Sequence, residues 1–137
     1  MPAGTRSEEY EAAAEFRLRL LAFQRRTEEV TSRCGLTPER YLLLLLIHVG
    51  EVRGERVNVS SLRAPLRLAQ SSVSRLVDGA VRAGLATRTA DTTDARRHFL
   101  SLTATGRGRL ERAFAELGPD RGELARALRG SGFDAIA

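Results

Sequence analysis

The side chains that could support covalent, metal or acid–base chemistry are few in this chain of 137 residues. The one thiol is Cys34, and the imidazoles are those of His48 and His98. Their positions match no metal-ligand spacing, and no pairing of a nucleophile with a base stands out along the chain. The sequence therefore predicts no enzyme, no cofactor and no metal site.

The placement of the arginines says more about function than the positions of the cysteine and the histidines do. All 22 basic residues are arginine. Residues 1–59 hold nine arginines and nine acids, residues 110–137 hold four and five, and residues 60–109 hold nine arginines against three acids, which gives 9 − 3 = +6. A solvated face in an arginine-rich chain is one explanation. The scarcity of acids in one stretch favours the other explanation, a surface that binds a polyanion.

Two apolar stripes flank this basic stretch and predict helices over 7–35 and 103–130. Ser7 and Thr103 are the expected capping residues, and residues 130–137 are expected to fray. A small lobe between the helices cannot cover both stripes, so the stripes predict a homodimer built from these two helices. The stripe positions are Ala13, Phe16, Leu20, Phe23, Thr27 and Val30 in the first helix, and Leu110, Phe114, Leu117, Leu124 and Leu128 in the last.

Residues 37–102 predict a compact lobe of helices and two strands. Thr37 and Pro38 start a central buried helix through the apolar run Tyr41–Ile47, and residues 50–58 are expected to form a loop. A short helix over 60–67 and a second helix capped by Ser71 follow, and Gly84 ends the second. Residues 85–89 and 98–102 then predict two strands. This order is typical of a mainly α winged helix-turn-helix with a small β-wing.

The second helix of this motif has the composition of a DNA-reading helix. One face is apolar, and the other is small and polar. Ser71, Ser72 and Ser74 would let the backbone approach a duplex, with Ser71 and Ser72 at phosphates, and the fork of Arg75 fits guanine O6 and N7. An ordinary amphipathic surface helix is the alternative. The net charge of the stretch and the flanking strands favour the DNA-reading helix.

The segments Val59–Leu62, Ser71–Asp78, Gly84–Leu85 and above all Asp94–Arg107 resemble the MarR family of bacterial regulators. The family's wing motif is matched by Asp94, Arg96, Leu102, Thr103 and Gly106, and the resemblance covers residues 36–110. It implies a dimer of intertwined first and last helices, with a recognition helix in each major groove. It also implies wings that place Arg96 and Arg97 near the minor groove, where Asp94 would orient Arg96. Pro65 inside the first helix of the motif and the long 50–58 loop depart from the family pattern.

The resemblance also implies a repressor that is released by small aromatic ligands or by oxidation. Phe16, Phe23, Tyr41 and His48 are the candidate lining of a ligand pocket, or else they are core residues. Cys34 is either a packed thiol or a peroxide sensor, and no second cysteine is present to resolve a sulfenic acid within the chain.

Together these observations predict a sequence-specific, DNA-binding transcriptional regulator that binds a pseudo-palindromic double-stranded operator as a homodimer. A winged-helix module that binds protein instead of DNA is the alternative. The longest apolar run is far shorter than the roughly 20 residues of a membrane span, and the first residues lack an apolar signal core. A cytoplasmic protein without membrane association is therefore expected.

Overall fold

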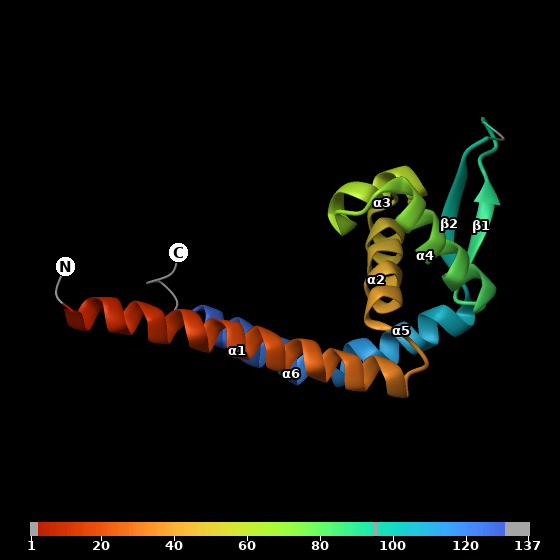
Figure 1. Ribbon diagram of the computed structural model, residues 1–137. Helices are drawn as coiled ribbons and strands as arrows, with labels where there is room; N and C mark the ends of the chain where they lie inside the picture. The colour runs from red at the N-terminus through yellow and green to blue at the C-terminus, as the bar shows by residue number, and fades with distance from the viewer. Residues whose placement is uncertain (1–2, 95, 131–137) are drawn as a thin grey trace. The chain divides into compact units, whose positions relative to one another are not determined.

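The computed structural model describes residues 3–94 and 96–130, with side chains from residue 6 onward. The chain divides into two compact units: a helical unit, residues 3–30 and 114–130, and a central unit, residues 31–113. The tail expected to fray, from residue 131 on, lies outside the described residues. The elements run in the order α1 (Ala3–Arg33), α2 (Pro38–Arg53), α3 (Val59–Leu66), α4 (Gln70–Arg82), β1 (Ala86–Ala90), β2 (His98–Leu102), α5 (Ala104–Glu116) and α6 (Gly118–Leu128) (Figure 1).

In the helical unit, α1 and α6 are joined by Arg26, whose Nε donates to Oδ2 of Asp120 at 3.4 Å. The predicted stripe of α1 is the half-buried face of this helix, and Val30 at its end is fully buried. The expected break at Gly118 and Pro119 is present, because α5 ends at Glu116 and α6 begins at Gly118. Ser7 lies inside α1 and is not its cap, since the preceding residues continue the helix to Ala3.

The core of the central unit forms around α2. Thr37 caps this helix by accepting a hydrogen bond from the backbone N–H of Arg40 at 3.1 Å, and Pro38 occupies its first turn as expected. The apolar run is not buried all round, because Leu42 is 44% exposed. The buried side chains of this helix and its neighbours include those of Tyr41, Leu43, Leu44, Ile47, Leu62, Val73, Val77, Leu85 and Leu100.

The loop expected over residues 50–58 is shorter than predicted, because α2 continues through Gly50 to Arg53. A Cβ atom at Gly50 would lie 2.2 Å from Cγ2 of Val57, so glycine is required here by close packing. The helix ends instead at Gly54, which has a left-handed φ of 70° and donates its N–H to the Glu51 carbonyl. The two glycines thus have different roles, and only Gly54 marks the start of the loop.

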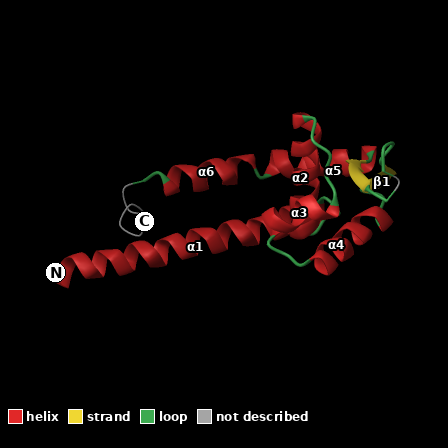
Figure 2. Ribbon diagram, turned by 90° about the horizontal axis from the view of Figure 1, so that it is seen from above, coloured by secondary structure: helices red, strands yellow, loops and turns green. Residues whose placement is uncertain are grey.

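Helices α3 and α4 form the expected helix-turn-helix and lie next to each other (Figure 2). Asn58 caps α3: its side chain accepts from the Ser61 N–H at 2.8 Å, and the Ser61 hydroxyl accepts from the Asn58 N–H at 2.9 Å. Pro65 lies in the last turn, where α3 ends one residue later. Ser71 does not cap α4, since the helix begins at Gln70 and its N-cap, Ala69, makes no side-chain hydrogen bond.

The wing is the antiparallel pair of β1 and β2, with Ala86 opposite Leu102 and Ala90 opposite His98. Leu100 also donates its N–H to the Val57 carbonyl at 2.7 Å, which ties the wing to the loop before α3. None of the helices in the described part of the chain combines the length and the apolar character that a membrane crossing requires.

The residues of the wing motif after β2 join the wing to α5. The Thr103 hydroxyl donates to the Gly84 carbonyl at 2.6 Å and accepts from the Gly106 N–H at 2.9 Å, so Thr103 caps α5 as predicted. A Cβ atom at Gly106 would lie 1.9 Å from the Leu85 carbonyl oxygen. Threonine and glycine at these two positions are therefore needed to hold α5 against the start of β1.

Candidate nucleic-acid interface

The predicted recognition helix, α4, buries one face and exposes another. Val73, Val77 and Ala80 are fully buried, as the apolar stripe predicted. Ser71 and Arg75 lie on the exposed face, whereas Ser72 and Ser74 are half-buried at its two edges. Four polar residues that were predicted to contact DNA therefore lie on α4, but only Ser71 and Arg75 are fully exposed.

The wing loop is held by a network around Asp91. Its carboxylate accepts the N–H and the hydroxyl of Thr93 at 3.0 and 2.9 Å and pairs with Arg56 at 2.8 Å. These bonds, those from Thr93 foremost, lower the pKa of Asp91 to about 2. Arg56 also stacks on Phe99, its Cζ 4.8 Å from the ring centre. The wing loop is thus fastened to the segment that precedes α3.

Asp94 orients its neighbours through the backbone. Its carboxylate accepts the Arg96 N–H at 3.0 Å, and its carbonyl accepts the Arg97 N–H at 3.0 Å. The prediction placed the Asp94 carboxylate beside the Arg96 side chain. The structure pairs this carboxylate instead with Arg97, at a long 3.9 Å. The side chain of Arg96 forms no ion pair with a described residue.

An open groove lies between the wing and the start of α3. It contains side chains from both elements, and its volume is about 560 Å³. Three arginines make its wing side basic. The lining residues are Asn58, Val59, Ser60, Arg88, Arg96, Arg97 and His98.

The structure separates the arginines of the basic stretch into two sets. Arg107 pairs with Glu51 at 2.7 Å, and Arg109 donates to the Gly35 carbonyl at 3.1 Å, so both hold helices together. Arg88 of β1 pairs with Asp78 of α4, and Arg97 pairs with Asp94 at 3.9 Å. The remaining set has no ion pair with any described residue and lies on α3, α4 and the wing or directly after α3: Arg63, Arg67, Arg75, Arg82 and Arg96.

Arg107 is held in an ion pair with Glu51 and is therefore not available to a ligand. Burial acts to raise the pKa of Glu51, but the Leu102 N–H at 3.0 Å, the guanidinium of Arg107 and the nearby His48 outweigh it, and the pKa is lowered. The Nδ1 atom of His48 lies 3.4 Å from Nη1 of Arg107. His48 thus contacts a structural ion pair of α2 and α5.

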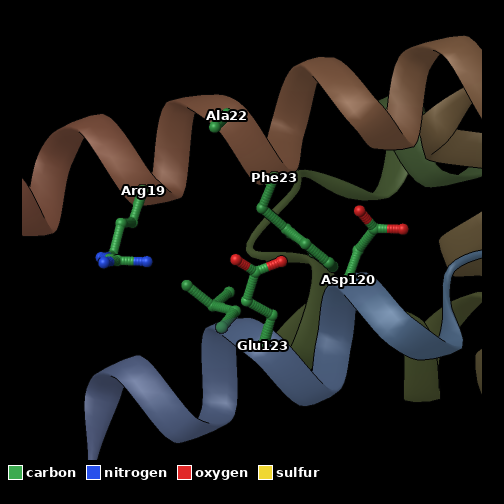
Figure 3. Close-up of a pocket in the computed structure, with 6 residues that line it drawn as sticks. Arg19, Ala22, Phe23, Asp120 and Glu123 are labelled. Carbon is green, nitrogen blue, oxygen red and sulfur yellow. The ribbon is translucent and has the colours of Figure 1, made fainter. Parts of the chain in front are cut away.

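The four residues predicted to line a ligand pocket are divided between the two units. Phe16 and Phe23 belong to the helical unit, whereas the buried Tyr41 and the half-buried His48 belong to the central unit. Phe23 borders a cavity of about 130 Å³ between α1 and α6, beside the carboxylates of Asp120 and Glu123 (Figure 3). Pockets for small molecules usually measure about 300–1,000 Å³, so this cavity is smaller than is usual for such a ligand.

Cys34 is buried, with 3% of its surface exposed, after the end of α1. This burial agrees with a packed thiol. Among the described residues, no group of three or more histidine, cysteine, aspartate or glutamate side chains is arranged to hold a metal ion.

Comparisons with known proteins show which solved structures this fold resembles. A scan against protein-family models gives no match, and neither does a search of the curated proteins. Among solved structures, a MarR family transcription regulator shares 26% identity, covers 88% of this chain and 76% of its own, and superposes with a TM-score of 0.67. The chain therefore has the fold of the MarR-family regulators that it resembles.

Two further MarR-family structures contain DNA. A mutant of MepR from S. aureus, bound to an oligodeoxyribonucleotide, is 18% identical, with 83% of this chain and 81% of that chain covered and a TM-score of 0.69. A mutant of MarR from E. coli, complexed with operator DNA, is 19% identical, with 83% and 79% covered and a TM-score of 0.68. The winged helix-turn-helix expected from the wing motif is thus confirmed.

Sequence reasoning missed two arginines that lie at α4. Arg88 was counted only as part of the net charge, and Arg40 lies outside the basic stretch. A Cβ atom at Gly79 of α4 would lie 3.1 Å from Nη2 of Arg40, so the guanidinium rests on the helix at this glycine. Spacing along the chain gives no sign of either contact. A glycine on the polar face of a predicted recognition helix is the one signal that could have suggested a close neighbour.

Proposed function

We propose that this protein is a sequence-specific DNA-binding transcriptional regulator, and that it acts as a repressor on a pseudo-palindromic operator. The observation that carries the proposal is the set of arginines without ion-pair partners among the described residues of α3, α4 and the wing. Arg75 projects from the exposed face of α4, and Arg96 borders the groove of the wing. Unpaired guanidinium groups on one motif suit phosphates and base edges.

The start of α4 supports the same proposal. Its N-cap, Ala69, provides no side-chain acceptor, unlike Thr37 in α2 and Asn58 in α3. Ser72 and Val73 donate their N–H groups to the Ala69 carbonyl, so the N–H groups of Gln70 and the exposed Ser71 are the ones available to an anion. A DNA phosphate at this helix start would take the place of the missing cap.

We propose a homodimer formed through the helices over 7–35 and 103–130. Exposed apolar side chains on α1 support it, above all Leu18, which is 65% exposed, together with Tyr10 and Leu21. Phe114 and Leu128 add exposed apolar surface from α5 and α6. Large exposed apolar side chains on one set of helices are typical of a subunit interface. A dimer would present two recognition helices to half-sites about 10 base pairs apart.

The proposed regulator responds to a small aromatic ligand or to oxidation, as the family resemblance implies. Phe16, Phe23, Tyr41 and His48 remain the candidate ligand residues, and Cys34 is the candidate for oxidation. The burial of Cys34 favours the ligand over oxidation. Cytoplasmic localisation is part of the same proposal, since the target is chromosomal DNA.

Binding isotherms on the DNA upstream of the gene and on a scrambled duplex, each at several salt concentrations, test the function. The regulator is expected to prefer one upstream site and to lose affinity steeply as salt increases. Equal affinity for both duplexes would contradict sequence specificity. Absence of DNA binding at low salt would favour the winged-helix module that binds protein.

A further inference from the structure

The contact between Arg40 and α4 brings a charge from another helix to the recognition helix. Arg40 lies in the first turn of α2, and its backbone N–H is held by the Thr37 hydroxyl. Nη2 of Arg40 lies 3.1 Å from the position of a Cβ at Gly79, and both Cζ and Nε lie 3.9 Å from it. The guanidinium therefore occupies the space that a side chain at position 79 would fill.

Gly79 and Asp78 define the two edges of the exposed face of α4. Each residue advances a helix by about 100°, so Ser71, Arg75 and Arg82 fall on a line between these edges. The Asp78 edge carries Arg88 from the wing strand β1. The Gly79 edge carries Arg40 from α2. A guanidinium from a neighbouring element thus lies along each side of the exposed line of α4.

This arrangement matches the shape of the major groove. A helix with its side chains is about 10–12 Å wide, and the major groove of B-DNA is about 12 Å wide, with a phosphodiester backbone along each wall. When Arg75 faces the base edges, each edge of α4 faces one of the two backbones. We infer that Arg40 binds a phosphate of the DNA strand on the Gly79 edge, opposite the edge that carries Arg88. This inference rests on the proposed DNA-binding function.

Arg40 is able to make such a contact because its donors are not used elsewhere. No described residue accepts a hydrogen bond from its side chain, and no described carboxylate pairs with it. A guanidinium offers five N–H donors in a planar fork that fits phosphate oxygens. Gly79 gives the guanidinium room against α4, and the Arg40 side chain stays half-exposed. Arg40 is thus positioned by packing, and its charge stays uncompensated.

The test compares four proteins on operator and scrambled DNA at several salt concentrations: wild type, Arg40→Ala, Arg40→Lys and Arg53→Ala. Arg53 is the matched control, an exposed arginine at the other end of α2. Arg40→Ala is expected to reduce the slope of log K against log salt by about 0.9 for each phosphate that the variant no longer binds. At about 0.15 M salt this equals roughly five-fold weaker binding per phosphate, alike on both DNAs. Arg40→Lys should keep most of the affinity, and Arg53→Ala should match wild type.

Two outcomes would overturn the inference while the proposed function stands: an unchanged slope for Arg40→Ala in a protein whose wild type binds the operator, or a weakening confined to the operator. The second result would mean that Arg40 only positions α4 for base reading. Failure of wild type to bind DNA would instead contradict the proposed function. Gly79→Leu provides a second approach if Arg40→Ala unfolds, because leucine displaces the guanidinium. It should lower the salt slope, and an unchanged slope in this folded variant would also overturn the inference.

Discussion

Two glycines of α5, two residues apart, should respond to alanine with opposite signs. A Cβ at Gly106 would lie 1.9 Å from the Leu85 carbonyl oxygen, whereas a Cβ at Gly108 would meet no atom within 4 Å. Gly108 is exposed and Gly106 is buried. Gly106→Ala should therefore destabilise the protein, and Gly108→Ala should stabilise it.

The size of each effect follows from the geometry. Real Cβ contacts are essentially never shorter than 3.0 Å, so Gly106→Ala requires a shift of at least 3.0 − 1.9 = 1.1 Å. Such a shift would break the Thr103 hydrogen bonds to Gly84 and Leu85, now 2.6 and 3.1 Å long. Breaking two hydrogen bonds costs about 1–3 kcal/mol, and residual overpacking costs about 1–3 kcal/mol more. Alanine returns about 1 kcal/mol of helix propensity, which leaves a net destabilisation of about 1–5 kcal/mol.

Gly108→Ala gains only that propensity, about 1 kcal/mol. Urea unfolding followed by circular dichroism measures both changes, with all proteins at one concentration, because dimerisation would make the midpoint depend on concentration. If both variants have the same m-value as wild type, the substitutions have not changed the unfolding reaction. If both variants shift the midpoint in the same direction, the close approach of α5 to β1 is not what requires glycine at position 106.

Four further substitutions have distinct expected results. Arg75→Ala should cost about 1–3 kcal/mol on the best operator and relax specificity at one base pair per half-site, and equal weakening on scrambled DNA would exclude base reading. Arg96→Ala should weaken binding to all duplexes and lower the salt slope by about one unit per contact, and an unchanged slope would remove Arg96 from the interface. The pKa of Asp91, about 2, lies below its ordinary 3.8, so the stability from its ionised form is complete above pH 3.8 and is lost as pH falls through 2. Asp91→Asn should therefore lower stability at neutral pH and flatten acid unfolding between these values, whereas an acid-unfolding curve like that of wild type would contradict this. Cys34→Ser should keep DNA affinity and leave any peroxide response unchanged, and a peroxide-driven release that this variant abolishes would identify a redox sensor.

The fold was largely predictable because its signals are local. Thr37 with Pro38, Gly84 and Thr103 each end or begin an element through a bond to a residue three positions away, and the structure has those bonds. Errors arose where side-chain packing, and not a capping residue, decides the local structure. Gly50 suggested a loop, yet it is a helical glycine required by Val57, and no pattern around position 50 reveals that contact.

The candidate interface was predictable only in part for the same reason. Periodicity alone separated the exposed face of α4, with Arg75, from its buried face. The charge count over residues 60–109 could not show that Arg107 is paired with Glu51, which lies outside that stretch. Nor could it include Arg40, whose place beside α4 depends on the packing of α2. Ion pairs between distant segments are fixed by tertiary structure and leave no mark in the spacing of the sequence.

The reciprocal cap of Asn58 and Ser61 bears on how the protein could be redirected to a new operator. Each side chain binds the other residue's backbone, so a change at either position would remove the cap of α3. Ser60 and Ser71 are exposed, and their hydroxyls bond to no described residue. A combinatorial library that varies Ser60, Ser71 and Arg75 while it keeps Asn58 and Ser61 should therefore yield new base preferences in variants that still fold.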